Sequence, residues 1–139
     1  MLSTRSPGRL HQVLLDGAVG VLPREDVRGL IVKDRDAAKV GEVDDLVIDA
    51  DAGHVRFMKV GFGGLLGLGR DHRLVPVDVV DSIAGDTVFI RPAMRQVKMA
   101  PNWGDLDSEV FMDDVCRHYG CETYWADGYQ APDWTHSDE

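Results

Sequence analysis

The sequence predicts a mainly β protein: a small β-barrel of about six strands, followed by one C-terminal helix and an aromatic, acidic tail. Three observations support this fold class. Short apolar runs recur between turns that contain Gly and Asp, a loop rich in glycine and leucine separates two of these runs, and one stretch near the C-terminus has helical periodicity. A closed barrel is favoured over a sandwich, because closure removes exposed strand edges.

The 139 residues are expected to form one domain with flanking segments. We expect a partly disordered N-terminal arm over residues 1–23, a barrel domain over 24–100, and the helix with its acidic tail over 101–139. Within the arm, residues 10–22 fit a strand or an extended segment about as well as a helix, because two glycines weaken the helical pattern.

Charge is distributed unevenly along the chain. Residues 1–100 contain 14 acidic and 14 basic residues, whereas residues 101–139 contain 10 acidic residues and one basic residue, so this last segment carries the whole net charge of −9. Because an acidic surface repels phosphate backbones, direct nucleic-acid binding is disfavoured. No apolar run approaches the roughly 18 residues that span a bilayer. We therefore expect a cytoplasmic protein, a location compatible with peripheral association with a membrane complex.

Five strands are expected in the barrel domain, over residues 27–33, 40–49, 55–62, 73–80 and 87–91. Asp- and Gly-containing turns join them, including a hairpin turn at 51–54 and a turn at 81–86, and residues 92–103 are expected to be irregular. In the third strand, side-chain alternation predicts that Met58, Val60 and Phe62 face inward and that Val55 and Phe57 lie on the outer face.

The loop between the third and fourth strands is interpreted as structural. Glycine permits backbone angles closed to other residues, and we expect at least one positive φ there, while the leucines between the glycines need to be buried. A phosphate-binding loop would require a helix directly after it, and a strand follows instead. The residues expected to shape this region are Gly63, Gly64, Gly67, Gly69 and Pro76, the last of which requires an edge strand or a bulge.

Residues 105–119 are predicted to form the helix, ended by Gly120 as a left-handed cap. If Gly120 is the C′ residue, Cys116 and Cys121 take the two positions that make the hydrophobic contact of a Schellman cap. Two alternatives are open: a redox disulfide, or a metal site with His118 and His136. The metal site lacks the second ligand pair that structural zinc needs, and two cysteines suit a reducing compartment.

Several acidic and histidine side chains are candidates for catalytic groups. Paired carboxylates need a desolvated member to work as acid and base, and aspartates at strand turns are usually solvated. The histidines lie in turns, where surface exposure is the ordinary interpretation. The residues considered are Asp44, Asp45, Asp49, Asp51, His54 and His72, and we expect no catalytic residue, no cofactor and no metal.

The tail is unusual, because disordered acidic tails normally lack aromatic residues. Trp103, Tyr124, Trp125, Tyr129 and Trp134 are therefore expected to dock on the chain's own barrel, on a second subunit or on a partner. We expect a homodimer in which this segment contributes to the interface. The residues predicted to form that interface are Phe57, Phe111, Met112, Val115, Tyr119, Tyr124 and Trp125.

Residues 25–92 resemble the PRC-barrel family, whose members include the cytoplasmic domain of the photosynthetic reaction-centre H subunit and the C-terminal barrel of a ribosome-maturation factor. The resemblance lies in Val27–Asp34, Lys39–Asp49, His54–Gly61, the Gly64–Gly69 loop and Leu74–Val77. One departure is Ala37-Ala38, where the family often has Asp-Gly. The segment 119–125 also resembles a short aromatic segment that follows some stand-alone members.

The resemblance implies a PRC-type barrel without catalytic residues, which acts as an interaction or assembly module and binds a protein partner or itself. A ribosome- or RNA-processing accessory factor is the alternative, which the acidic C-terminal segment disfavours. A redox or metal protein that uses Cys116 and Cys121 is the third hypothesis.

Overall fold

The computed structural model describes residues 10–13, 23–49, 53–64, 69–102, 108–126 and 128–135. It is mainly β, as the sequence predicts. Its elements, in chain order, are β1 (Leu10–Val13), the 3-10 helix η1 (Pro23–Glu25), β2 (Ile31–Lys33), β3 (Lys39–Asp49), β4 (His54–Phe62), β5 (Asp71–Pro76), the 3-10 helix η2 (Val77–Val79), β6 (Val80–Ala84), β7 (Thr87–Ile90), α1 (Met94–Lys98) and α2 (Glu109–Tyr119).

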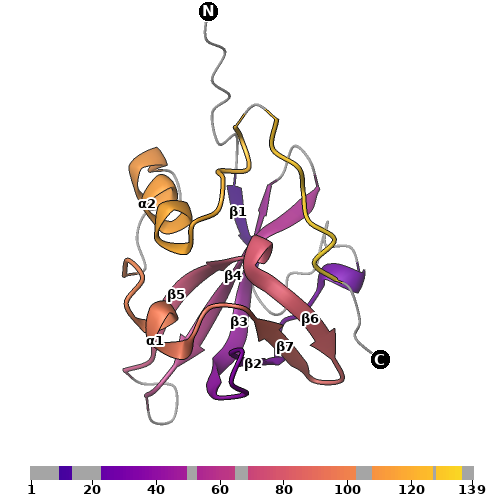
Figure 1. Cartoon of the computed structure of the whole chain (residues 1–139), viewed down its shortest axis with the longest axis vertical. Coiled ribbons are helices and arrows are strands. Elements are labelled where there is room, and N and C mark those ends of the chain that lie inside the picture. The colour runs from indigo at the N-terminus through magenta and orange to yellow at the C-terminus, as the bar shows by residue number, and fades with distance from the viewer. Residues whose placement is uncertain are drawn as a thin grey trace, which may run out of the picture.

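The long strand β3 organises the sheet, because it pairs antiparallel with β4, β2 and β1. From there the sheet continues in both directions and gives the order β5-β4-β3-β2-β7-β6, in which only the β2–β7 pairing is parallel. The end strands β5 and β6 do not pair with each other among the described residues, so hydrogen bonds do not close the sheet. Figure 1 shows the β6–β7 hairpin and α2 on opposite sides of the central strands.

The predicted fourth strand, 73–80, and the turn predicted after it are partly wrong. Strand β5 ends at Pro76, η2 follows, and β6 runs through most of the expected turn to Ala84. Proline has no N–H to donate to a strand ladder, which accounts for the break at this position. The turn is confined to Gly85 and Asp86, and Gly85 has a φ of 60°.

Val55 and Phe57, which side-chain alternation places on the outer face of the strand, are covered within the chain itself. Both are 1% exposed, as deeply buried as Met58 and Val60, whereas Phe62 is only partly buried. Two features explain this. The β3–β4 pairing shifts register between Val47 and Ile48, and the C-terminal segment covers the second face of β4, so that Val55 lines a small cavity together with Trp134.

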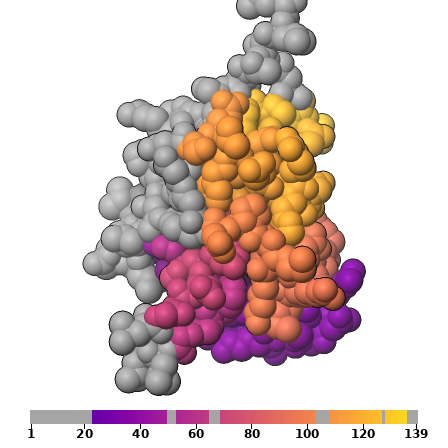
Figure 2. Space-filling model, turned by 90° about the vertical axis from the view of Figure 1, so that its left-hand side faces the viewer, coloured from indigo at the N-terminus to yellow at the C-terminus, as the bar shows by residue number. Residues whose placement is uncertain are grey.

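Helix α2 begins after Ser108, whose Oγ accepts a hydrogen bond from the amide of Phe111 at 3.2 Å. Its expected first residues, 105–107, lie outside the described part of the chain. The short helix α1 replaces part of the irregular segment predicted at 92–103, and Gln96 joins it to α2: the Gln96 amide donates to the carbonyl of His118, and the His118 ring bonds the carbonyl of Gln96 at 2.7 Å. Figure 2 shows the C-terminal residues, in orange and yellow, forming one surface with the residues around α1.

Candidate functional site

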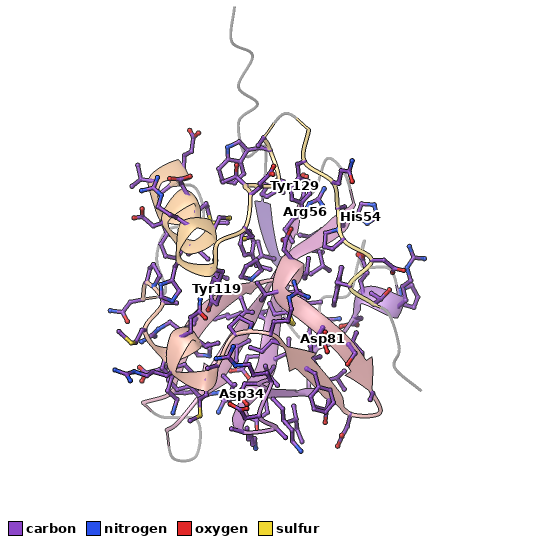
Figure 3. All side chains as sticks on the ribbon, viewed as in Figure 1. Asp34, His54, Arg56, Asp81, Tyr119 and Tyr129 are labelled. Carbon is purple, nitrogen blue, oxygen red and sulfur yellow. The ribbon has the colours of Figure 1, made fainter. Side chains whose placement is uncertain are left out.

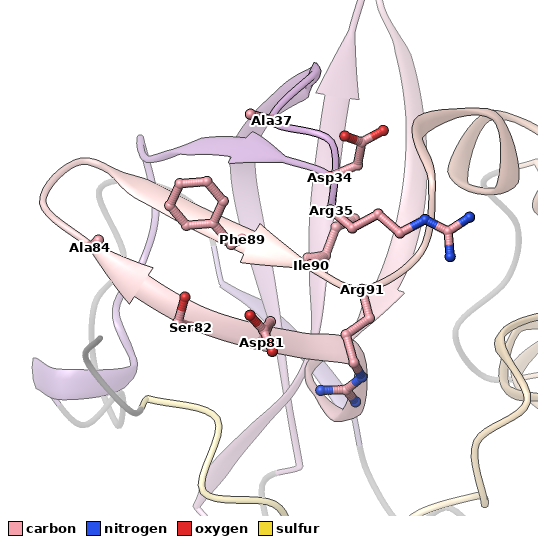
Figure 4. A pocket seen from close by; sticks show the side chains of 9 residues that line it. All are labelled: Asp34, Arg35, Ala37, Asp81, Ser82, Ala84, Phe89, Ile90 and Arg91. Atoms are coloured by element: carbon pink, nitrogen blue, oxygen red, sulfur yellow. The ribbon is translucent and has the colours of Figure 1, made fainter. Parts of the chain in front are cut away.

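A groove of about 530 Å³ lies between the β6–β7 hairpin and the turn that joins β2 to β3. Figure 4 shows the side chains that line this space, some on the hairpin and some on the turn. We call it the hairpin groove. Its lining is apolar in the middle and charged at the rim, and consists of Asp34, Arg35, Ala37, Asp81, Ser82, Ala84, Phe89, Ile90 and Arg91.

The wall formed by the turn is held by the buried carboxylate of Asp34, which is 4% exposed. Its Oδ1 accepts hydrogen bonds from the amides of Asp36 and Ala38, both at 2.9 Å, and its Oδ2 accepts one from Met94, at the start of α1, at 2.8 Å. Burial acts to raise the pKa of Asp34, but these three amides outweigh it and hold the pKa below its usual range. The wall is thus tied to α1.

The rim of the hairpin groove carries two arginines and one exposed carboxylate. Arg91 donates hydrogen bonds to the carbonyls of Val80 and Asp78, which fixes its guanidinium beside the start of β6. Arg35 and Asp81 are exposed. The lining therefore holds two carboxylates and two guanidinium groups, and the exposed Arg35 is the group that a carboxylate of a ligand could pair with.

Strand β6 forms the hairpin's outer side and lies at one end of the sheet path. An edge strand presents N–H and C=O groups that an added strand can pair with. Phe89, which is partly buried, and Ile90, which is 1% exposed, lie on β7, on the paired side of β6, whereas the edge of β6 that has no partner among the described residues faces away from β7. The arrangement can therefore hold an extended segment by its backbone and by one apolar side chain.

The base of the glycine loop contains a compact ionic cluster. The Nε and one terminal nitrogen of Arg70 donate to Asp44 at 2.7 and 3.1 Å, and the same terminal nitrogen reaches Glu42 at 2.6 Å and the carbonyl of Gly61 at 3.0 Å. His72 Nε2 lies 2.8 Å from Asp44 Oδ2, the oxygen that also accepts from Arg70 Nε. These contacts raise the pKa of Arg70 and tie the residue that follows the loop to β3 and β4.

The glycines predicted to shape this loop have the expected backbone angles where they are described. Gly63, Gly64 and Gly69 have φ of 73°, 80° and 72°, whereas Gly67 lies outside the described residues. Pro76 is the last residue of β5, an end strand, where its missing N–H costs little.

A glycine that sequence reasoning missed is Gly61. A Cβ there would overlap the carboxylate of Asp44 and the Nε of Arg70. Only a residue without a side chain allows the ionic cluster to lie directly against β4. A lone glycine within a strand was the available signal.

A second cluster fastens the tail to the sheet. The guanidinium of Arg56 lies 5.1 Å from the ring centroid of Tyr124 and 5.7 Å from that of Tyr129, and 3.5 Å from the carboxylate of Asp49. The hydroxyl of Tyr129 donates to Asp78 at 2.8 Å. Figure 3 shows Arg56 and Tyr129 side by side. Arg56 was not singled out from the sequence, because nothing there links β4 to the tail.

The residues predicted to form an interface are mostly buried within the chain itself. Exposed fractions are 8% or less for Phe57, Met112, Val115, Tyr119, Tyr124 and Trp125, and Phe111 is partly buried. Trp134 is also buried, and Trp103 lies outside the described residues. The tail therefore docks on its own sheet, one of the three arrangements that the sequence left open.

The cysteines lie where the cap hypothesis puts them. Gly120 has a φ of 71°, its amide donates to Arg117, and the amide of Cys121 donates to the carbonyl of Cys116 at 3.0 Å. This is the hydrogen-bond pattern of a Schellman cap. Both thiols are free, Cys116 buried and Cys121 partly exposed.

The aspartates and histidines named above as possible catalytic groups do not come together in one site. Asp44 binds Arg70, Asp49 approaches Arg56, and His54 lies 3.3 Å from the buried Glu25. Asp45 is buried, while Asp51 and His136 lie outside the described residues. Within the described ranges, no group of three or more His, Cys, Asp or Glu side chains is placed to hold a metal ion.

Comparison with known proteins adds one finding. A family model described as PRC-barrel domain matches residues 20–94, which is more than half of the chain. No curated protein matches the sequence. Neither helix in the described part of the chain has the length and apolar character needed to cross a membrane.

Proposed function

The chain belongs to the PRC-barrel family, whose domain is in general one of protein interaction and assembly, and from that premise we propose that it is a non-catalytic assembly module. In this proposal the hairpin groove receives a protein partner. The observation that supports it is the lining of one groove. A turn fixed to α1 through Asp34, the apolar side chain of Phe89 and the guanidinium groups of Arg35 and Arg91 meet there, beside the end strand β6.

The groove's chemistry defines the kind of partner. An extended segment could add to the edge of β6, place an apolar side chain near Phe89, and pair a carboxylate with Arg35 or Arg91. A second copy of this chain satisfies the charge requirement, because residues 101–139 contain 10 acidic residues and one basic residue. We therefore propose a homodimer as one assembly formed through this groove, and a cytoplasmic location, since the two free thiols suit a reducing compartment.

Site-specific photo-crosslinking under native conditions tests the groove. A photoreactive phenylalanine analogue at position 89 should capture a partner, whereas the same analogue at Phe111, a partly buried position on α2, should not. Arg35→Glu should abolish capture at position 89. Arg95→Glu makes the same charge change at an exposed position of α1 outside the groove, and should leave capture intact. Equal capture from both positions, or capture unaffected by Arg35→Glu, would contradict the proposal.

A further inference from the structure

The two thiols at the end of α2 differ in access but touch each other. Cys116 is 2% exposed, whereas Cys121, five residues later, is only partly buried. The cap holds them together, because the Cys121 amide donates to the Cys116 carbonyl at 3.0 Å and the Cys121 thiol donates to the same carbonyl at 3.6 Å. The C3 and C″ side chains of a Schellman cap contact each other, which brings the two sulfur atoms into one place.

Cys121 also opens into a hollow of about 420 Å³ between α1, α2 and the start of β6. We call this the thiol hollow. Two arginines, Arg35 and Arg91, line it together with Gln96 and the carboxylate-bearing Asp78. Asp78 is engaged by the hydroxyl of Tyr129 and lies partly buried. A small molecule in this hollow would therefore meet the partly buried thiol of Cys121, two guanidinium groups and the carboxylate of Asp78.

We propose that Cys121 is a thiol modification site for disulfides of small, carboxylate-bearing thiols, with Cys116 as the resolving thiol. The arginines recognise the carboxylates of the incoming disulfide, and the half-exposed sulfur makes the attack. The buried sulfur then completes the exchange without leaving the cap. The product is an internal disulfide that locks the end of α2 to the segment that follows it.

The steps balance in atoms and electrons. The Cys121 thiolate attacks one sulfur of the small-molecule disulfide, forming a mixed disulfide and releasing one thiolate. Cys116 then loses its proton and attacks the sulfur of Cys121, and the second small thiolate leaves and is protonated. Overall, the two protein thiols are oxidised to one disulfide and the small disulfide is reduced to two thiols.

Protonation favours this division of roles. Contact with the Cys121 side chain, together with burial, raises the pKa of Cys116, whereas contact with the Cys116 side chain lowers the pKa of Cys121. Burial and the carboxylate of Asp78 oppose ionisation of Cys121 but do not outweigh its contact with the Cys116 side chain. Cys121 is therefore the attacking thiol and Cys116 keeps its proton until the second step.

The test uses the reduced full chain and glutathione disulfide as the probe, followed by intact mass and peptide mapping. Wild type should lose two hydrogens in mass and contain a Cys116–Cys121 disulfide. Cys116→Ser should stop at a stable mixed disulfide on Cys121. Because its remaining thiol is buried, Cys121→Ser should react at least about tenfold more slowly than Cys116→Ser. Modification of Cys116 in preference to Cys121, or equal rates for the two variants, would overturn the assignment.

Recognition of the carboxylates is tested separately with hydroxyethyl disulfide, which carries no charge. Arg35→Glu should lower the rate with glutathione disulfide, relative to this neutral probe, by about threefold to tenfold, since one guanidinium becomes a carboxylate near the reacting sulfur. Arg95→Glu should leave the ratio unchanged. A ratio insensitive to Arg35→Glu would overturn the part of the proposal that assigns the arginines.

Discussion

The carboxylate of Asp34 accepts a hydrogen bond from the amide of Met94 at 2.8 Å, so a turn residue between β2 and β3 caps a helix that begins sixty positions later. The same carboxylate holds the amides of Asp36 and Ala38. Asp34→Ala leaves three amides without this acceptor and should lower the free energy of unfolding by about 2–4 kcal/mol. Chemical denaturation measures it. Asp36→Ala, an exposed neighbour, should change stability by less than about 0.5 kcal/mol, and an equal loss in both variants would contradict the assigned role.

Ala37, in the same turn, has a φ of 64°, in the left-handed region that disfavours side chains with a Cβ. Ala37→Gly should therefore raise the free energy of unfolding, by up to about 1 kcal/mol, because relief of strain exceeds the added entropy of the unfolded chain. Ala38→Gly, next in sequence and without a positive φ, should be neutral or destabilising. Denaturation midpoints of the two variants should move in opposite directions; a loss of stability in Ala37→Gly is the opposite of what we expect.

Gly61 lies beneath the ionic cluster at the base of the glycine loop. Gly61→Ala would push Asp44 and Arg70 apart and should cost about 2–4 kcal/mol, as other overpacked sites do. Gly29→Ala is the matched control, because its φ of 87° is strained but nothing lies near the added Cβ, so its cost should stay near 1 kcal/mol. Thermal unfolding compares the two, and a milder effect at position 61 than at position 29 would refute the close approach.

The same cluster makes stability depend on pH on the acidic side. Lys39 and Arg70 lower the pKa of Glu42, and hydrogen bonds from Arg70 and His72 outweigh burial to lower that of Asp44. Carboxylates with depressed pKa values stabilise the fold above their unfolded values, about 4.3 for Glu and 3.9 for Asp, and this stabilisation is lost as the pH falls through the folded values.

Arg70→Met should therefore destabilise most at neutral pH, and its difference from wild type should shrink below about pH 4. Denaturant titrations at a series of pH values measure this difference. Arg95→Met, on exposed α1, should show no such trend. A difference that is constant with pH would mean that Arg70 acts by packing alone.

Light scattering tests the proposed homodimer on the full chain. Wild type should have the mass of a dimer at micromolar concentration, and Arg35→Glu should shift it toward a monomer if the hairpin groove forms the contact. A monomer at high micromolar concentration would exclude the dimer. Dimerisation that Arg35→Glu leaves intact would place the contact elsewhere on the molecule.

The sequence predicts those features of the fold that depend on residues close to one another along the chain. Turn glycines, the C-terminal cap at Gly120 and the apolar strands follow short-range rules, so these elements were found near their observed positions. The burial of Val55 and the role of Arg56 depend on a tail some seventy residues away, and no periodicity within β4 contains that information. The hairpin groove was missed for the same reason, because it joins a turn to a hairpin through tertiary packing.

The parallel ladder between β2 and β7 has a kinetic consequence. Among the described strands, every other pairing joins strands that lie close along the chain or involves β3. The β2–β7 pairing instead joins Ile31 to Thr87, with β3, β4, β5 and β6 between them in the sequence. Closing so long a loop costs chain entropy before any contact repays it. The hairpins β3–β4 and β6–β7 can therefore form early as separate units, and we expect their joining at β2 to be the slow step that completes the sheet.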